Sequence, residues 1–295
     1  MVTLNLDKDF DPFFHSASGS CSIKNFDFSS GFEPHVQNLN KLNGADVLIT
    51  VRFKDGNDLM RLMLANDSAK RAGAKSISVF IPFLPFARQD HLVVDGDPLS
   101  LRVFADIINL AGFKKVILFD PHSDVATAVI NNSIAINNYS FVGDILVAKR
   151  NYRTASTDAG GYKKIFPLVM HLGRRMGGQN DIIICDKVRD PNTGKVISTT
   201  VNIDDAQGQD IYLIDDIVDG GYTFEMIGEE LLTRNTGDIY LIASHWIGSK
   251  GEEGLKKYFK RVYTTNSVKD VTSDFVIQTN MSNIIMDNLH RINVS

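Results

Sequence analysis

The residues with the most specific chemical potential occupy one segment, Asp215–Thr223 (DDIVDGGYT), directly after the apolar run Ile211–Ile214. Consecutive glycines at a strand-to-helix turn let backbone N–H groups converge on an anion, and the dipole of the following helix adds to the attraction. Carboxylates do not suit a phosphate by themselves, but they suit sugar hydroxyls or a Mg²⁺ ion between sugar and phosphate. The segment therefore predicts a site for a phosphorylated sugar. The alternative is a turn with solvated acids.

A second polar segment follows the run Lys115–Asp120 (KVILFD), where Pro121, His122, Ser123 and Asp124 come next. An acid, an imidazole and a hydroxyl at a strand end could hold a hydrated Mg²⁺ ion. The same residues could equally form a capping turn, with Ser123 or Asp124 as the N-cap of the next helix. The residues alone leave both interpretations open.

The segment Phe80–His91 (FIPFLPFARQDH) is aromatic and rigid at first and then abruptly polar. Aromatic rings can flank a purine, and the guanidinium group of Arg88 can bind phosphates through two parallel hydrogen bonds. This pattern favours a nucleotide site. The alternative is a loop whose phenylalanines pack into the core.

The segment Asp186–Lys195 (DKVRDPNTGK) follows the apolar run Asp181–Cys185 and carries two cations, Lys187 and Arg189, on one side of an extended stretch. A turn-rich sequence follows, which is typical of a mobile arm. Such an arm can close over a transferring phosphoryl group and neutralise its developing charge. A charged surface hairpin is the alternative.

These segments are connected by short apolar runs, typical of strands, that alternate with helical patterns. Strands that alternate with helices form a mainly parallel, doubly wound sheet, so the predicted fold class is α/β. Ligands of such sheets bind beyond the carboxyl ends of the strands. The patterns predict strands at residues 45–51, 76–82, 115–120, 181–186, 211–216 and 238–245, and helices at 58–72 and 98–111.

The alternation occurs twice, before and after the polar, turn-prone stretch Asn131–Tyr139. A chain of 295 residues is long for one domain and suits two of about 150 residues each. We therefore expect two domains, residues 1–136 and 137–295, each with a mainly parallel sheet flanked by helices.

The composition is that of an ordinary globular protein, with 43% hydrophobic and 22% charged residues. No run approaches the ~20 apolar residues of a membrane span, and residues 1–14 lack the pattern of a secretory signal. Two cysteines, Cys21 and Cys185, are too few for a disulfide framework, and Cys185 lies in an apolar run that predicts a buried, inert thiol. These features favour a reducing cytoplasm. The net charge of −4 argues against a broad electrostatic surface for nucleic acid.

The chemical segments occur in an order that resembles the ribose-phosphate diphosphokinase family, also called phosphoribosyl-pyrophosphate synthetases. The likeness spans nearly the whole chain, and no single motif is decisive, but five in order are specific. They are Phe86–Asp90 (FARQD) for the family's Y-A-R-Q-D, Asp120–His122 (DPH) for D-L-H, Ser156–Gly161 (STDAGG) for S-P-D-x-G-G, Asp186–Arg189 (DKVR) for D-K-x-R, and Asp215–Thr223 for D-D-x-x-D-T-x-G-T.

The resemblance implies two phosphoribosyltransferase-like domains and a reaction that moves the β,γ-diphosphoryl group of ATP to the C1 hydroxyl of ribose 5-phosphate, with Mg²⁺ as the cofactor. It also implies a homo-oligomer, because the family assembles as dimers within hexamers.

The resemblance further implies a role for each matching residue. Lys187 and Arg189 would be the catalytic cations of a flexible loop. ATP would be bound by Arg88, Gln89 and Asp90 and, through a loop that reaches a neighbouring subunit's adenine site, by Ser30, Gly31 and Glu33. The metal ligands would be Asp120, His122 and Asp158. Ribose 5-phosphate would be bound by Asp215, Asp216, Asp219, Gly220, Gly221, Tyr222 and Thr223.

The chain departs from the family's pattern in two loops. Gly220 stands where the family has threonine and Tyr222 stands where glycine is usual, and a tyrosine forced to a positive φ would cost on the order of 1 kcal/mol or more. In the adenine loop Ser30 replaces an acid and Phe32 is an extra residue, and His91 follows Asp90 where arginine is usual. These departures bear on the adenine site and on allosteric control more than on the reaction.

Two other functions are alternatives. A phosphoribosyltransferase, which consumes phosphoribosyl diphosphate, shares the acidic glycine-rich loop but does not need the Arg88–Asp90 segment or two such domains. A non-catalytic regulatory homologue would be expected to lose the loop cations or the metal-site residues. Lys187, Arg189, His122 and Asp158 are all present.

Overall fold

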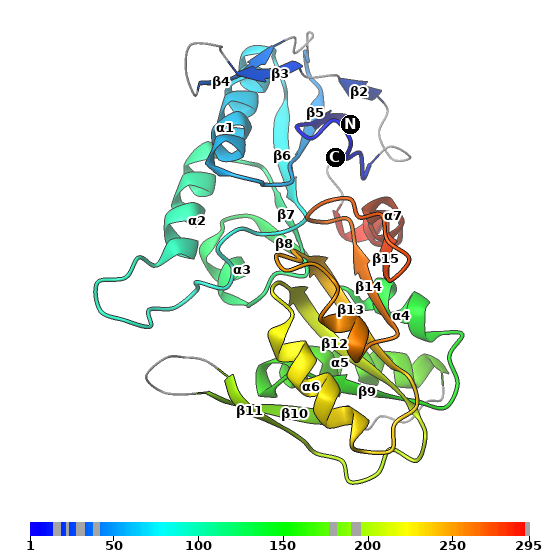
Figure 1. Cartoon of the computed structure of the whole chain (residues 1–295). Helices are drawn as coiled ribbons and strands as arrows, with labels where there is room; N and C mark the ends of the chain where they lie inside the picture. Colours follow the sequence, from blue (N-terminus) through cyan, green and yellow to red (C-terminus); the bar gives the residue numbers. More distant parts are fainter. Residues whose placement is uncertain are drawn as a thin grey trace. The chain divides into compact units, whose positions relative to one another are not determined.

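The computed structural model describes residues 1–13, 19–21, 24–27, 33–37, 42–176, 182–189 and 196–292. The chain forms two compact units (Figure 1). Unit 1 consists of Met1–Asn138 together with Asn280–Ser295, and unit 2 consists of Tyr139–Thr279. Among the described residues, no helix has the length and the apolar character needed to span a bilayer.

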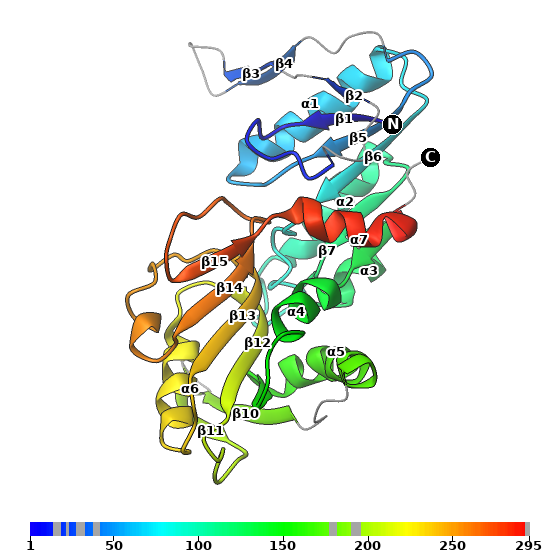
Figure 2. The ribbon, with the colours of Figure 1, turned by 90° about the vertical axis from the view of Figure 1, so that its right-hand side faces the viewer.

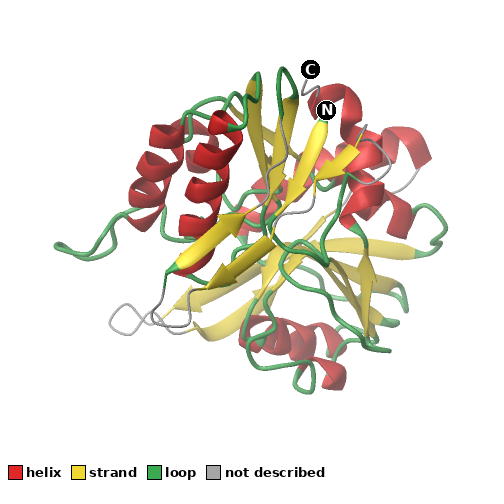
Figure 3. Cartoon of the chain, turned by 90° about the horizontal axis from the view of Figure 1, so that it is seen from above, coloured by secondary structure: helices red, strands yellow, loops and turns green. Residues whose placement is uncertain are grey.

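Unit 1 contains a parallel sheet whose strands lie in the order β2-β1-β5-β6-β7-β8. Helices α1 and α2 lie side by side against this sheet, and the C-terminal helix α7 contacts the edge strand β8 (Figures 1 and 3). An antiparallel pair, β3 and β4, lies beside α1. The bounds are β1 Val2–Asn5, β2 Gly19–Cys21, β3 Lys24–Asp27, β4 Pro34–Gln37, β5 Asp46–Thr50, α1 Gly56–Arg71, β6 Ser76–Ile81, α2 Ser100–Ala111, β7 Val116–Phe119, α3 Val125–Val129, β8 Ser133–Ile136 and α7 Met281–Ile292.

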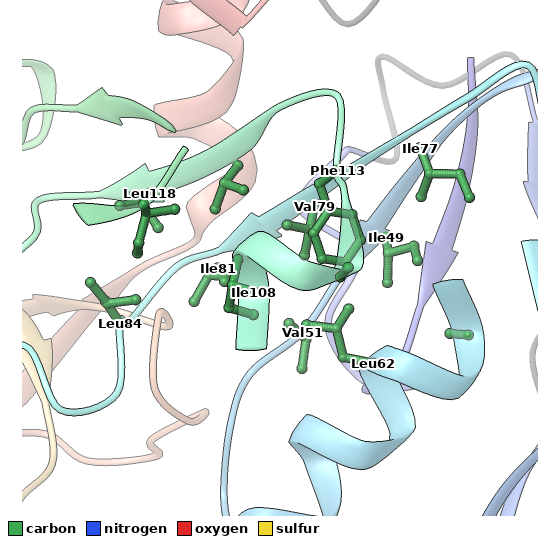
Figure 4. Packing of buried hydrophobic residues seen from close by; sticks show 14 of the residues in the cluster. Ile49, Val51, Leu62, Ile77, Val79, Ile81, Leu84, Ile108, Phe113 and Leu118 are labelled. Carbon is green, nitrogen blue, oxygen red and sulfur yellow. The ribbon is translucent and has the colours of Figure 1, made fainter. Parts of the chain in front are cut away.

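The core of unit 1 lies between its sheet and its helices. The strands are nearly continuous apolar runs, as parallel strands covered on both faces must be, and every residue of β7 is buried. Leu62 of α1 and Ile108 of α2 pack against Ile49 and Val79 of the sheet (Figure 4). This packing holds the carboxyl ends of the strands in place, where the predicted site residues lie.

Unit 2 contains a sheet of order β11-β10-β9-β12-β13-β14-β15, which is parallel except for the antiparallel pair β10 and β11. Helix α6 lies on one side of this sheet, and α4 and α5 lie on the other (Figure 2). The bounds are α4 Tyr139–Leu146, β9 Tyr152–Ser156, α5 Ala159–Met176, β10 Ile182–Arg189, β11 Val196–Val201, β12 Asp210–Val218, α6 Tyr222–Leu232, β13 Ile239–Trp246, the 3₁₀ turn η1 Leu255–Lys257, β14 Arg261–Thr265 and β15 Val276–Thr279.

Four tyrosines form a row across neighbouring strands of unit 2, namely Tyr152, Tyr212, Tyr240 and Tyr263. The rings of Tyr212 and Tyr240 stack with their centroids 4.7 Å apart, and Tyr152 meets Tyr212 edge-on at 5.5 Å. Burial, reinforced by the neighbouring Tyr240 and Tyr263, raises the pKa of the Tyr212 hydroxyl far above its ordinary value. The Tyr212 hydroxyl therefore stays protonated at alkaline pH values at which a free tyrosine ionises.

The predicted fold class is confirmed, because both units are mainly parallel sheets flanked by helices. Cys185 is fully buried in unit 2, as its apolar run predicts.

The division of the chain differs from the predicted domains 1–136 and 137–295 at both ends of unit 2. The polar stretch around residue 135 is not a linker but carries strand β8, which completes the sheet of unit 1 by pairing with β7. Unit 2 therefore begins at Tyr139, and the last helix, α7, returns to unit 1. The apolar side of α7, with Met281, Ile284 and Ile285 buried, has its partner there.

Candidate functional site

In unit 2, the ends of two neighbouring strands bring two of the predicted motifs together. Strands β9 and β12 pair in parallel, with Ser156 opposite Ile214, so that the residues after each strand lie at the same edge of the sheet. Thr157 Oγ1 donates a hydrogen bond of 2.9 Å to Oδ2 of Asp215. The Ser156–Gly161 and Asp215–Thr223 segments are thus in direct contact.

The two consecutive aspartates after Ile214 have different surroundings. Asp215 is partly exposed, and its Oδ1 accepts a hydrogen bond of 2.8 Å from the backbone N–H of Asp216. Asp216 is buried and forms an ion pair of 3.0 Å with Lys164 of α5. Asp215 therefore suits contact with a ligand, whereas Asp216 connects β12 to the helix behind it.

The residues Asp219–Thr223, which we call the glycine loop, join β12 to α6. Gly221 is the N-cap of α6 and has a left-handed backbone with φ of +84°. It offers no side chain to the first backbone N–H groups of the helix, which are left for another acceptor. A loop of this form can bind an anion at the positive end of the helix dipole.

The strain expected at Tyr222 is not found. The residue that needs a positive φ is Gly221, and Tyr222 is already the first residue of α6. Tyr222 is 57% exposed. Tyrosine at this position, where the family usually has glycine, is therefore accommodated without backbone strain.

Asp158 lies at the start of α5 and caps that helix. Its Oδ1 accepts a hydrogen bond of 2.7 Å from the N–H of Gly161, and its carbonyl oxygen accepts one of 2.8 Å from Tyr162. A side chain at Gly161 would crowd the Thr157 hydroxyl at 3.1 Å, which explains the second glycine of this motif. The carboxylate is thus held at the same sheet edge as Asp215.

In unit 1, Asp120 ends strand β7 in a strained backbone conformation with φ of +38°. It is buried, and its Oδ2 accepts a hydrogen bond of 3.0 Å from Asn138 Nδ2. Strain of this kind is kept where the surrounding structure enforces it, often at functional sites. His122 follows two residues later with an exposed side chain. Helix α3 begins after Asp124, which makes no side-chain capping bond.

The FARQD segment of unit 1 is a tight turn. Phe86 has a positive φ of +61°, and its carbonyl oxygen accepts a hydrogen bond of 2.8 Å from the N–H of Gln89. Its ring is 49% exposed and leans on Phe104 of α2, with a centroid distance of 5.9 Å. Arg88 and Gln89 are exposed. The turn presents an aromatic ring, a guanidinium and an amide together, whereas Phe80 packs in the core.

Asp90 forms a close contact of 2.6 Å with the ring of His91. Partial burial is the largest influence on the pKa of Asp90 and raises it, but Ser123, His91 and the Asp90 backbone together bring the pKa below its ordinary value. The Ser123 hydroxyl has no partner at hydrogen-bond distance among the described residues, so the His91 contact is the firmer of the two. Asp90 is therefore a carboxylate at neutral pH.

Lys187 and Arg189 lie on β10, opposite Thr199 and Val196 of β11. The pairing shifts register between Val188 and Arg189. The two cations thus belong to an antiparallel hairpin whose connecting residues, 190–195, lie outside the described part of the chain, as do Ser30 and Gly31. Glu33, the remaining predicted adenine-loop residue, is exposed.

The described residues contain no group of three or more His, Cys, Asp and Glu side chains that could hold a metal ion by themselves. Mg²⁺ rarely needs such a group, because it binds through one or two carboxylates, water and the phosphates of the substrate. Asp158, with its carboxylate fixed at a strand end, and the exposed His122 fit that pattern, whereas the buried Asp120 is engaged by Asn138.

Sequence reasoning did not single out three residues that shape these sites. Thr157 lies within a recognised motif and could have been assigned from it. Lys164 and Asn138 carry no local signal, because their contacts with Asp216 and Asp120 depend on the packing of α5 and on the end of β8.

Comparison with known proteins gives one consistent family. A model of the N-terminal domain of ribose phosphate pyrophosphokinase matches residues 15–112. The ribose-phosphate pyrophosphokinase of Helicobacter hepaticus is 30% identical over 253 residues, covering 82% of this chain and 77% of the relative. That of Bacillus subtilis is 27% identical over 259 residues, covering 85% and 78%.

A solved structure supports the fold. The crystal structure of phosphoribosylpyrophosphate synthetase from Mycobacterium smegmatis superposes with a TM-score of 0.81 and 21% identity, over 99% of this chain and 98% of the other. The resemblance seen in the sequence motifs is confirmed, and this chain belongs to the ribose-phosphate pyrophosphokinase family.

Proposed function

We propose that this chain is a ribose-phosphate diphosphokinase, which transfers the β,γ-diphosphoryl group of ATP to the C1 hydroxyl of ribose 5-phosphate. The products are 5-phosphoribosyl 1-diphosphate and AMP. The observation that carries the proposal is the edge of the unit 2 sheet, where Asp215, held by Thr157, stands next to a glycine loop at a helix N-terminus. This edge suits a sugar that carries a phosphate.

The geometry of this edge supports a role for each of its residues. The glycine loop takes the 5-phosphate, because its backbone N–H groups and the dipole of α6 converge there. The carboxylate of Asp215 accepts hydrogen bonds from the ribose hydroxyls and so sets the direction of the C1 hydroxyl. Asp216 supports β12 through Lys164 rather than contacting the sugar.

The ATP side is proposed for the turn Phe86–Asp90, where the Phe86 ring offers a face to the purine and Arg88 and Gln89 contact phosphates. Lys187 and Arg189 stabilise the charge that develops on the transferring group, so they bind the transition state more tightly than the ground state. Asp158 and His122 each serve as a ligand of Mg²⁺, which neutralises phosphate charge when it is bound.

We further propose that the protein works as a homo-oligomer in the cytoplasm. The adenine-loop residues Ser30, Gly31 and Glu33 would reach the ATP site of a neighbouring subunit. Sedimentation of the purified protein tests this proposal, because a monomer at assay concentration with full activity would contradict it.

The reaction is tested by incubating the purified protein with ATP, ribose 5-phosphate and Mg²⁺ while AMP and phosphoribosyl diphosphate are measured separately. Equal amounts of both products, with a strict requirement for all three additions, are the expected result. The assay is repeated over a range of inorganic phosphate concentrations. If neither product forms in any of them, the proposal of diphosphoryl transfer is wrong. A chain that instead consumes phosphoribosyl diphosphate with a purine base would be a phosphoribosyltransferase.

A further inference from the structure

The segment Ile247–Leu255 follows β13 and is fastened to the glycine loop of unit 2. The N–H groups of Ile247 and Gly248 both donate to the carbonyl oxygen of Val218, at 2.8 and 3.1 Å. Val218 is the last residue of β12 and directly precedes the glycine loop. The two segments therefore keep a fixed relation to each other.

The segment also has a defined internal shape. The N–H of Gly251 donates to the carbonyl oxygen of Gly248 at 3.1 Å and closes a turn. Gly248 has φ of +59°, and a Cβ there would clash with the indole ring of Trp246, so only glycine fits. This turn carries Ser249 and Lys250 at its tip.

The far end of the segment also packs against the glycine loop. The Leu255 side chain lies 3.5 Å from the position that a Cβ on Gly221 would take. A Cβ at Gly254 would clash with the carboxylate of Glu225, because the Glu225 side chain fills that space. The segment thus contacts the residues around the glycine loop at both of its ends.

Lys250 lies directly beside Gly220. Its Cδ and Cε atoms are 3.8 and 3.9 Å from the position of a Cβ on Gly220, and the Ser249 hydroxyl oxygen is 3.9 Å from it. The ammonium group is one bond beyond Cε. Lys250 is exposed, and it has no ion pair or hydrogen bond with any described residue. The Lys250 side chain, which has no partner among the described residues, therefore lies beside Gly220. Unlike Gly221, Gly220 has no positive φ.

We propose that Lys250 is a specificity-determining residue that binds the phosphate of the sugar phosphate held by the glycine loop. The inference rests on the proposed function and adds one residue to it. Backbone N–H groups supply partial charges, and an ammonium adds a full charge and up to three donors. Gly220 leaves the approach of Lys250 to the loop open, because it places no side chain between them.

The consequence is a selectivity for phosphorylated over unphosphorylated ribose that depends on Lys250. A charge-assisted hydrogen bond at a partly exposed site corresponds to about a tenfold change in affinity. Loss of Lys250 should not affect ATP binding, because Lys250 lies at the glycine loop and not at the proposed ATP turn.

The test compares Lys250→Ala and Lys250→Arg with Lys257→Ala, a matched control that removes an exposed lysine of the same unit. In Lys250→Ala, the KM for ribose 5-phosphate should rise about tenfold while kcat and the KM for ATP change less than about twofold. The preference for ribose 5-phosphate over ribose should fall by the same factor. Lys250→Arg should restore most of the loss, and Lys257→Ala should match the wild type.

Two results would overturn the inference, and they are distinguishable. If the wild type forms phosphoribosyl diphosphate and Lys250→Ala has the same KM for ribose 5-phosphate as Lys257→Ala, Lys250 has no role at the phosphate. If the wild type forms no phosphoribosyl diphosphate, the proposed function fails and this inference fails with it. Thermal melting of each variant confirms that it is folded before the kinetics are compared.

Discussion

The hydroxyl of Thr157 donates a 2.9 Å hydrogen bond to the carboxylate of Asp215 and thereby joins the ends of two neighbouring strands, β9 and β12. Together with the bond from the Asp216 N–H to the other carboxylate oxygen, it holds a partly exposed carboxylate in one orientation. A carboxylate held in one orientation accepts ligand hydroxyl groups at a smaller entropic cost.

Thr157→Val keeps the shape of the side chain and removes the donor. We expect kcat/KM for ribose 5-phosphate to fall about tenfold, because Asp215 loses one of the two hydrogen bonds that orient its carboxylate. Initial rates at varied ribose 5-phosphate measure this. Thr233→Val, at the end of α6, removes an exposed hydroxyl and serves as the control. Equal kinetics in the two variants would show that the bond has no part in sugar binding.

Lys187→Ala removes one of the two cations on β10. We expect kcat to fall at least 100-fold with little change in the KM values, because the cation acts on charge that develops in the transition state. The melting temperature should stay within a few degrees of the wild type. Near-normal turnover would remove Lys187 from the mechanism, and Lys257→Ala again controls for the loss of one positive charge.

Gly221→Ala and Gly220→Ala form a matched pair in the glycine loop. Gly221 has φ of +84°, which an alanine adopts only with strain, whereas Gly220 has no positive φ and its nearest atoms are 3.8 Å from an added Cβ. We expect Gly221→Ala to lower the free energy of unfolding by about 1 kcal/mol or more and Gly220→Ala to change it by less than about 0.5 kcal/mol. Urea unfolding curves measure both changes. A larger loss of stability in Gly220→Ala than in Gly221→Ala would contradict the backbone conformation described for the two glycines.

The stability of unit 2 should fall at alkaline pH because of Tyr212. Burial, then Tyr240 and Tyr263, raise the pKa of this hydroxyl in the folded state above its ordinary value of 10.0. The folded state therefore keeps the proton above pH 10 while the unfolded state releases it, so that the free energy of unfolding decreases as the pH rises beyond about 10. Below that pH the contribution is fully present.

Unfolding midpoints in urea at pH 8 and pH 11, for the wild type and Tyr212→Phe, measure this effect. The phenylalanine has no hydroxyl to titrate, so its midpoint should fall less between the two pH values. If the urea midpoint falls equally in the wild type and in Tyr212→Phe, the alkaline loss of stability comes from groups other than Tyr212.

The strands that carry the site could be predicted from the sequence because they are apolar runs that end in polar motifs. The predicted strands at 76–82 and 211–216 correspond to β6 and β12, and the helix at 58–72 corresponds to α1. Strand β8, with the sequence SIAI inside a polar stretch, was not predicted, because its burial comes from β7 and α7 rather than from its own pattern.

The candidate site was predictable to the extent that its residues lie within motifs. The glycine loop and the acids before it were found this way, and their roles remain proposals. Lys250 was not found, because its relation to Gly220 depends on the path of the chain after β13, thirty residues further along. The conformation of Tyr222 also required the backbone, since the sequence does not show which of three consecutive residues takes the positive φ.

The return of α7 to unit 1 makes unit 2 an insertion within a discontinuous domain. Residues 139–279 are one uninterrupted stretch, but unit 1 is built from two stretches that the chain reaches before and after unit 2. Any exchange of unit 2 between relatives must therefore join the chain at two points. A fragment cut after Asn138 would carry the sheet of unit 1 but not the helix that covers β8, so the shortest complete version of unit 1 is a fusion of both stretches rather than a truncation.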